Sequence, residues 1–242
     1  MYFTMLPKVF LYGMITKVTR SSEWPSSVNN PYQYLILDLD DTLYPRRTGL
    51  LEEIGRRILL YLTERMGFSP EESVELRKRF NVQYGTALRG LQIEHTIDPA
   101  DYLHFVHDVP LQNYLALDPA LGAMLSRIPL NKAVFTNADT AHAQRVLNCL
   151  GVAHHFPVIV DIYAVEFHCK PRPEAYRRML DLIGAEGRAC IMVEDSARNL
   201  HPARELFGIT TVIVDGARSD GVDYAIGDLR ELESLLHRIS AL

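Results

Sequence analysis

Short apolar runs alternate with amphipathic stretches along most of the chain. Five such runs occur: YLILDL (34–39), KAVFTN (132–137), PVIV (157–160), ACIMVED (189–195) and TTVIVD (210–215). Short, uniformly apolar runs are typical of strands buried on both faces of a parallel sheet. Stretches with helical periodicity accompany them at residues 139–150, 173–184, 197–207 and 228–239. This alternation predicts an α/β fold with a doubly wound parallel sheet.

The first two runs are separated by a long segment with helical patterns, although a crossover between parallel strands needs only about a dozen residues. One apolar stripe runs along LLEEIGRRILLYLTERM (50–66), formed by Leu51, Ile54, Ile58, Leu62 and Met66. The next stretch, PEESVELRKRFNVQYG (70–85), begins with a proline at a helix-opening position. We therefore predict an all-helical domain at residues 46–117, inserted into an α/β core formed by residues 32–45 and 118–242.

Composition narrows the class of protein. The 242 residues, 48% hydrophobic and 23% charged, can form one core with an insert. The net charge of −5 offers no basic surface for a nucleic-acid polymer, and no stretch reaches the roughly 18 apolar residues of a membrane span. We therefore expect the protein to bind neither a nucleic-acid polymer nor a membrane. Three scattered cysteines, Cys149, Cys169 and Cys190, exclude a disulfide framework and suit a cytoplasmic location.

Residues 1–31 are predicted to form a leader outside the core. Within them, VFLYGMI (9–15) lies between Lys8 and Lys17 and resembles the apolar part of a secretion signal. No small-residue cleavage site follows it. We therefore expect an accessory segment and not a signal peptide.

Three aspartates, at positions 38, 40 and 41, follow the first run. Alternate strand residues point to the same side, so we expect Asp38 and Asp40 to point together at the carboxyl end of the strand, where open α/β sheets bind ligands. Two carboxylates this close ionise readily only with a cation between them. Oxygen donors favour Mg²⁺, which keeps waters that a phosphate can replace. Taken alone, these aspartates could equally shape a turn.

Polar groups also follow three later runs. Thr136 and Asn137 precede a helix, where a hydroxyl and free backbone N–H groups can hold phosphate oxygens. Lys170 lies in a loop, and Glu194 and Asp195 leave the fourth run. Each alone is compatible with a helix cap or a solvated side chain. Together they predict a phosphoryl-transfer site with a nucleophile, an acid/base, a hydroxyl, a balancing cation and acids for Mg²⁺.

These motifs resemble those of the haloacid dehalogenase superfamily. Its aspartate, Thr/Ser, lysine and paired-acid motifs are matched in order by DLDDT, FTNA, CKPRPEAY and VEDSARN. The resemblance covers about residue 33 to the C-terminus and implies a Rossmann-like core with a C1-type helical cap. Strings similar to those of the pyrimidine 5′-nucleotidase group are DDTLYPRRTGL, QYGTALRGL and FTNADTAHAQRVLNCLG. True dehalogenases of this superfamily lack the acid two residues after the nucleophile, so Asp40 favours phosphate chemistry.

The resemblance implies a role for each acidic residue. Asp38 would attack phosphorus and form an aspartyl-phosphate, while Asp40 would act first as an acid and then as a base. Mg²⁺ would be held by Asp38, Asp195 and the backbone carbonyl of Asp40, with Glu194 binding directly or through water. Thr42 is expected to brace the loop.

Other residues would hold the substrate. Phosphoryl oxygens would be gripped by Thr136, Asn137 and Lys170. Candidates for contact with the leaving group from the cap are Tyr44, Tyr84, Thr86 and Arg89, since aromatic and guanidinium groups can stack on a base. For Tyr84 and Arg89, packing in the cap and surface exposure are the alternatives.

The favoured function is a Mg²⁺-dependent phosphatase acting on nucleoside monophosphates, especially those of pyrimidines. Its partner would be a small phosphate monoester, and the protein would be a monomer or homodimer. The alternatives are a sugar-phosphate or phosphoglycolate-type phosphatase, a phosphomutase, and a catalytically idle protein that binds a phosphorylated ligand. His104 and His107 are expected to be satisfied residues of a surface helix and not metal ligands.

Overall fold

The computed structural model of the chain describes residues 30–216 and 220–240. Its centre is a six-stranded sheet: β1 (Tyr34–Leu37), β2 (Asn131–Phe135), β3 (Val158–Val160), β4 (Cys190–Glu194), β5 (Thr210–Val214) and β6 (Tyr224–Ile226). The strand order is β3-β2-β1-β4-β5-β6, and every pair is parallel. The predicted doubly wound α/β core is therefore confirmed. Of the predicted leader, residues 1–29 lie outside the described residues.

The parallel register brings the carboxyl ends of the inner strands to one edge. Leu37 in β1 lies opposite Val134 in β2 and Val193 in β4. The backbone N–H of Asp38 donates to the carbonyl of Val193 over 3.0 Å, so the pairing continues one residue past β1. The chain runs outward from β1 to β3 and re-enters on the other side of β1 at β4. This reversal places β1 where sheets of this kind bind ligands.

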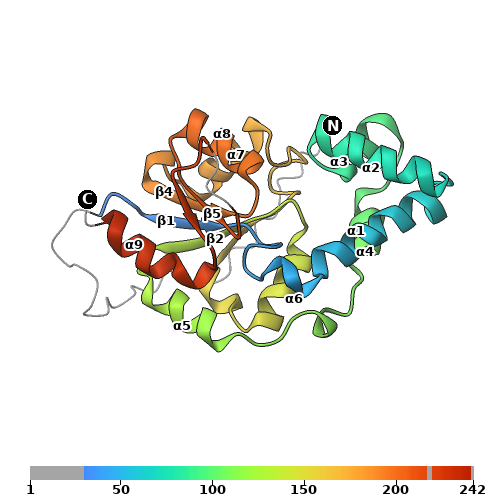
Figure 1. Ribbon diagram of the computed structural model, residues 1–242. Coiled ribbons are helices and arrows are strands. Elements are labelled where there is room, and N and C mark those ends of the chain that lie inside the picture. Colours follow the sequence, from blue (N-terminus) through green and yellow to red (C-terminus); the bar gives the residue numbers. More distant parts are fainter. Residues whose placement is uncertain (1–29, 217–219, 241–242) are drawn as a thin grey trace, which may run out of the picture.

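Five α-helices cover the sheet: α5 (Pro119–Arg127), α6 (Thr140–Leu150), α7 (Pro173–Ile183), α8 (Ala197–Phe207) and α9 (Leu232–Ser240). Leu35 and Leu37 of β1 pack in one core with residues of α5, α6 and α9, whereas Ile36 packs in the other with residues of α7 and α8. Figure 1 shows these two layers below and above the sheet. Because both faces are covered, the middle residues of the inner strands are apolar and polar residues lie toward the strand ends, so the strand sequences show no polar alternation.

Two details near the C-terminus differ from the predictions. Strand β6 was not predicted, since its three residues, YAI, are too few to show a periodicity. The helix predicted at 228–239 begins as a 3-10 turn at Leu229 and becomes α9 only at Leu232. The other short helical turns are Arg46–Thr48, Leu111–Asn113, Ala153–His155 and Gly187–Ala189.

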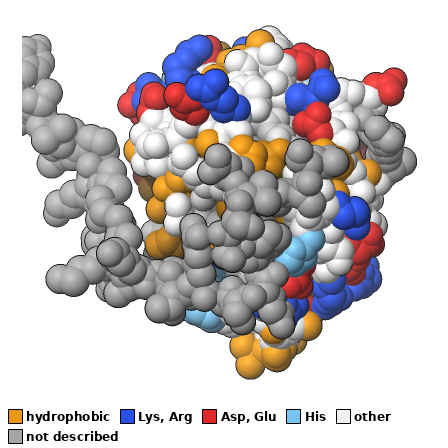
Figure 2. All heavy atoms as spheres, turned by 90° about the vertical axis from the view of Figure 1, so that its left-hand side faces the viewer, with side chains coloured by type: hydrophobic (Ala, Val, Ile, Leu, Met, Phe, Trp, Pro, Cys, Tyr) orange, Lys and Arg blue, Asp and Glu red, His pale blue; other side chains and the backbone are white. Residues whose placement is uncertain are grey.

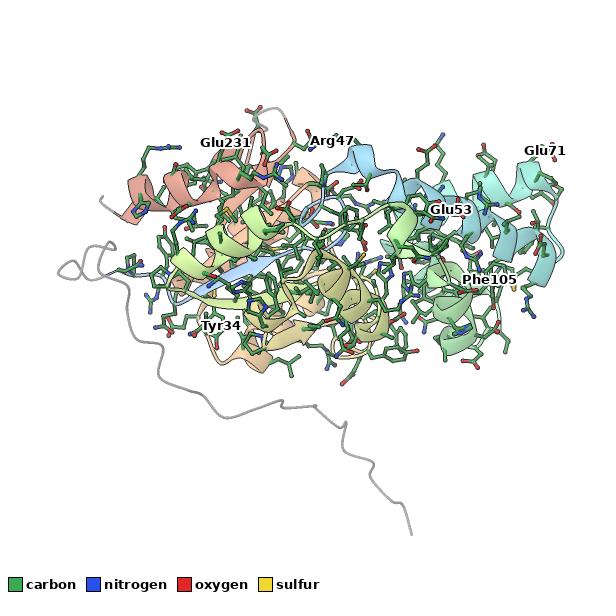
Figure 3. All side chains as sticks on the ribbon, turned by 90° about the horizontal axis from the view of Figure 1, so that it is seen from below. Tyr34, Arg47, Glu53, Glu71, Phe105 and Glu231 are labelled. Atoms are coloured by element: carbon green, nitrogen blue, oxygen red, sulfur yellow. The ribbon has the colours of Figure 1, made fainter. Side chains whose placement is uncertain are left out.

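The helices of the inserted segment gather at one end of the molecule (Figure 1). They are α1 (Leu50–Leu60), continued by a π-helical turn (Tyr61–Arg65), α2 (Pro70–Tyr84), α3 (Ala87–Glu94) and α4 (Pro99–His107). We call them the cap and propose that it extends over residues 46–117. In Figure 3, Arg47 lies between the core, which carries Tyr34 and Glu231, and the cap, which carries Phe105.

The apolar stripe of the first cap helix includes one residue that was predicted wrongly. Leu51 is 36% exposed, and Leu50 is fully buried in its place. The helix begins directly after Gly49, whose φ of +78° is left-handed, and its buried positions then follow Leu50 and Ile54 at a spacing of four. Helix α2 begins with a capping box between Ser69 and Glu72. Among the described residues, no helix is long and apolar enough to cross a membrane.

The end of the molecule opposite the cap carries charges of both signs. Figure 2 shows lysine and arginine side chains next to aspartate and glutamate at the rim of this face, around apolar side chains. The carboxyl ends of the strands face the other end of the molecule, toward the cap, and sheets of this kind bind ligands at those ends. The cap end is therefore the place to look for a ligand site.

Candidate active site

The strand ends bring the predicted core residues together around Lys170. The ammonium group of Lys170 donates to Asp38 Oδ1 over 2.7 Å and to Glu194 Oε1 over 3.0 Å. A third bond reaches the carbonyl of Phe135, the last residue of β2, over 2.9 Å. Lys170 is only 2% exposed, so this contact joins β1, β2 and β4 inside the molecule. Although burial lowers the pKa of Lys170, the two carboxylates raise it above its usual range, and the lysine stays charged.

Thr136 and Asn137 shape the loop over this lysine. The side-chain amide of Asn137 donates to the carbonyl of Lys170 over 3.2 Å and accepts from its backbone N–H over 2.8 Å. This amide is therefore occupied by the loop, and it fixes the start of the lysine side chain. Thr136 Oγ1 accepts from the N–H of Ala138 over 3.0 Å. Its hydroxyl proton meets no acceptor among the described residues and is the group better placed to hold a phosphate oxygen.

Three carboxylates form the acidic part of the site. Oxygen atoms of Asp38, Glu194 and Asp195 lie within 4.8 Å of one another. Burial raises the pKa of Asp38 well above its usual range, and Glu194 adds to the effect, while Lys170 opposes it. Burial and then Glu194 raise the pKa of Asp195 to about 7. One buried lysine therefore does not balance the negative charge here, and a divalent cation bound by hard oxygen donors would fit.

Glu194 and Asp195 offer different oxygens to such a cation. Glu194 Oε2 accepts from the N–H of Ser196 over 2.7 Å, while Oε1 accepts from Asn199 as well as Lys170. Both oxygens of Glu194 are thus engaged, which favours ligation through water. Asp195 Oδ2 accepts from Arg46 over 2.9 Å, and its Oδ1 has no partner among the described residues. We call Lys170, Glu194, Asp195 and Arg46 the charged flank of Asp38.

Asp40 is held by a tyrosine and a histidine on the other side. Its Oδ1 accepts from the hydroxyl of Tyr44 over 2.6 Å and lies 3.2 Å from Nε2 of His142. Burial alone would raise the pKa of Asp40, but His142 and the Tyr44 hydroxyl lower it below its usual value. Tyr44 is only 2% exposed. It therefore lies beside the site, with its hydroxyl committed to Asp40 and not free for a substrate.

His142, His107 and Asp139 were not among the predicted site residues. The ring of His107 stacks on that of His142 with centroids 4.2 Å apart, and its Nδ1 lies 2.9 Å from Asp139 Oδ2. We call Tyr44, His142, His107 and Asp139 the histidine flank. His107 was expected on a surface helix, yet it is buried at the end of α4, whereas His104 is exposed. Within the motif FTNADTAH, the position of His142 in the first turn of a helix aimed at the site was the available signal.

The cap contacts the core beside Lys170. The thiol of Cys169 donates to the carbonyl of Tyr84 over 3.2 Å, and the Thr86 hydroxyl donates to the sulfur over 3.7 Å. Between them, Gly85 has a φ of +98°, and a Cβ there would lie 2.7 Å from the sulfur and 3.1 Å from the carbonyl of Lys170. The backbone of this turn therefore rests directly on the loop that carries Cys169 and Lys170.

The remaining predicted cap residues are placed differently from one another. The hydroxyl of Tyr84 donates to Glu94 over 2.9 Å, so Tyr84 is tied to the cap itself. Arg89 is half-buried, and no bond or ion pair of its guanidinium occurs within the described part of the chain. Arg89 is thus the better candidate for substrate contact. The Thr42 hydroxyl is buried and has no partner among the described residues, so no side-chain bond supports its expected bracing role.

A cavity of about 490 Å³ opens between α4 of the cap and the start of α6. It lies next to the histidine flank, and its lining includes Asp139, His142, Arg145 and Tyr163. This volume lies within the range of pockets that bind small molecules.

Comparison with known proteins decides the family. The family model described as haloacid dehalogenase-like hydrolase matches residues 32–206. The chain belongs to the haloacid dehalogenase-like hydrolases. A curated relative from Saccharomyces cerevisiae, Phosphate metabolism protein 8, is 29% identical over 153 residues, which cover 57% of this chain and 48% of that protein. The chain thus spans about half the length of this relative.

Solved structures of this hydrolase family share the fold. A phosphatase from Thermococcus onnurineus (TM-score 0.56, 18% identity) covers 84% of this chain and 97% of its own. A 2-haloacid dehalogenase from Pseudomonas syringae (0.54, 19%) covers 86% and 99%, and a protein described as a predicted phosphoglycolate phosphatase from Haemophilus somnus (0.55, 17%) covers 85% and 98%. Such low identities show the fold alone. Because phosphatases and a dehalogenase share it, the reaction has to be argued from the site.

Proposed function

We propose that the chain is a Mg²⁺-dependent phosphomonoester hydrolase whose nucleophile is Asp38. The observation that carries this proposal is the separation of partners between two neighbouring acids: Asp38 is bonded to Lys170, whereas Asp40 is bonded to Tyr44 and His142. A halide leaves without a proton, but an alkoxide needs one. A second carboxylate with its own supports is therefore expected of a phosphatase.

In the first half of the reaction, Asp38 attacks phosphorus and the bond from phosphorus to the ester oxygen breaks. Asp40 gives its proton to that oxygen, so the products are an aspartyl-phosphate and an alcohol. The lowered pKa of Asp40 means that it is ionised before substrate binds. An incoming phosphate dianion disfavours that charge and raises the pKa again, so the proton is taken up with the substrate.

In the second half, Asp40 takes a proton from a water that attacks the aspartyl-phosphate, and Asp38 is restored. The Thr136 hydroxyl holds a phosphoryl oxygen, while Lys170, whose three N–H groups are engaged by Asp38, Glu194 and Phe135, supplies positive charge beside the phosphoryl group. Asp38, Asp195 and, through water, Glu194 would hold Mg²⁺. When bound, this ion neutralises charge that Lys170 alone leaves unbalanced.

For the substrate, we propose a nucleoside 5′-monophosphate, with pyrimidines preferred. The resemblance of the core and cap strings to the pyrimidine 5′-nucleotidase group supports this choice, and the 490 Å³ cavity supports a leaving group of this size. The name of the yeast relative, Phosphate metabolism protein 8, is compatible with phosphate release.

A substrate panel tests the proposal. Pyrimidine and purine nucleotides, sugar phosphates and phosphoglycolate are incubated with the full chain, with Mg²⁺ or with EDTA, and phosphate release is followed. We expect Mg²⁺-dependent turnover with the highest kcat/KM for UMP or CMP. A preference for phosphoglycolate or a sugar phosphate would show that the proposed substrate is wrong, while the proposed reaction, hydrolysis of a phosphate monoester, would stand. Rearrangement without phosphate release would indicate a mutase, and binding without turnover of any ester would indicate an idle ligand-binding protein.

A further inference from the structure

We infer that His142 is a positioning residue that, together with Tyr44, orients the Asp40 carboxylate for proton transfer. This inference rests on the proposed function, because the orientation of Asp40 matters to the reaction only if Asp40 exchanges protons with the leaving group and water.

The two contacts fix one oxygen of Asp40 and leave the other open. Tyr44 and His142 both approach Oδ1, at 2.6 Å and 3.2 Å. They come from different elements, Tyr44 from the same loop and His142 from the first turn of α6. No bond to Oδ2 occurs among the described residues. An ionised carboxylate with one oxygen held from two directions cannot rotate freely, so Oδ2 is presented in one direction.

The ring of His142 is held firmly enough to do this. Asp139 Oδ1 accepts from the backbone N–H of His142 over 2.7 Å and caps α6. Its other oxygen, Oδ2, lies 2.9 Å from the ring of His107, which stacks on the ring of His142 at an interplanar angle of 18°. One carboxylate of Asp139 therefore fixes both the backbone of His142 and the ring that packs against it.

Among the described residues, the His142 ring has one polar partner, Asp40. The ring is buried, and Nδ1 has no hydrogen-bond partner in the described part of the chain. A proton on Nε2 would be donated to Asp40 Oδ1, 3.2 Å away. Its contact with Asp40 is thus the one hydrogen bond of this ring within residues 30–216 and 220–240, which is the pattern expected of a group that orients Asp40.

Two substitutions separate positioning from packing. His142→Met keeps a long, bulky side chain without a donor, whereas His142→Gln keeps an N–H donor. For each, kcat/KM is measured with Mg²⁺ on an alkyl phosphate, whose leaving group needs a proton, and on p-nitrophenyl phosphate, whose leaving group departs without one. The ratio kcat/KM covers the steps up to the aspartyl-phosphate, in which Asp40 acts as the acid.

We expect His142→Met to lower kcat/KM by about 30-fold on the alkyl ester and by less than about threefold on the aryl ester, since general acid catalysis is lost only where it is needed. His142→Gln should recover most of the loss. The exposed His154, in the short turn Ala153–His155 and outside the lining of the 490 Å³ cavity, is changed to alanine as the control and should change neither value.

Equal losses on both esters, or a glutamine variant no better than the methionine variant, would overturn the inference. If neither His142 variant folds, Tyr44→Phe removes the second donor alone and must show the same leaving-group dependence; uniform loss there would also overturn it. A parent protein that hydrolyses neither of these esters nor any nucleotide, sugar phosphate or phosphoglycolate of the panel above would instead refute the proposed function.

Discussion

The two flanks of Asp38 hold their residues by different physics. On the charged flank, Lys170 bonds two buried carboxylates, and Arg46 bonds Asp195 from a position that is 69% exposed. On the histidine flank, an aspartate is held by a phenol and a ring that stacks on another ring. A lysine and an arginine therefore hold the carboxylates where phosphate and a cation would bind, whereas a hydroxyl and a histidine ring hold the carboxylate that has to gain and lose a proton.

The largest effect is expected at Asp38, the proposed nucleophile, which Lys170 of the charged flank bonds directly. Asp38→Asn removes the nucleophile but keeps its shape, so kcat should fall by about 10³-fold or more. The temperature of unfolding should not fall, because an ionisable group with a strongly raised pKa is replaced by a neutral one. Phosphate release and thermal unfolding measure the two effects. Activity within tenfold of the parent would show that Asp38 is not the nucleophile.

The next largest effect is expected from a substitution that removes the central cation of the charged flank. Lys170→Met leaves Asp38 and Glu194 buried without their cation, so the free energy of unfolding at neutral pH should fall by about 3–5 kcal/mol. Activity should fall by about 10²-fold or more, since the positive charge that positions Asp38 beside the phosphoryl group is lost. Urea unfolding and kcat/KM are the measurements.

A matched control exists in the same sheet. Lys132 of β2 is also buried, but within the described residues its ammonium donates to two carbonyls alone, those of Ile128 and Leu130, and burial lowers its pKa to about 8. Lys132→Met should therefore cost about 1 kcal/mol and leave kcat/KM unchanged. If the two variants were equally unstable, the pairing with carboxylates would not be what makes Lys170 important.

A smaller effect is expected in the pH dependence of Mg²⁺ binding to the charged flank. Asp195 has a pKa of about 7 without metal and must lose its proton to bind Mg²⁺. Below pH 7 the proton competes with the ion, so affinity should rise by up to about tenfold between pH 6 and 7 and then level off above pH 8. Mg²⁺ titrations followed by calorimetry at pH 6, 7 and 8 test this. An affinity independent of pH would remove Asp195 from the metal site.

The smallest expected effect lies on the cap. Arg89→Ala should lower kcat/KM by about fivefold to tenfold on a nucleotide and by less than twofold on a simple alkyl phosphate, if its guanidinium contacts the base. Arg56→Ala is the control, because Arg56 is paired with Glu53 on the surface of α1. Equal losses of kcat/KM on both substrates would argue against base recognition by Arg89.

The contrast between the two flanks also explains which parts of the fold and of the site could be predicted from the sequence. Strands buried on both faces and acids at their ends are local patterns, so the sheet, the cap helices and the residues around Asp38 could be predicted. The histidine flank depends on a contact between α4 and α6, where His107 meets His142. No local spacing encodes such a contact. Tyr44 was likewise assigned to the substrate because its hydroxyl partner, four residues away, depends on how the loop turns.

The absence of a side chain at Gly85 has a consequence for engineering. Cap and core meet there through main-chain atoms, with no room for even one methyl group between the turn and the sulfur of Cys169. If this cap is exchanged for another to obtain a new specificity, the turn should therefore be transplanted together with the core residues that it contacts, within 169–172. In a chimera that keeps only one side of this contact, a side chain in the turn would collide with the core and hold the cap away from it.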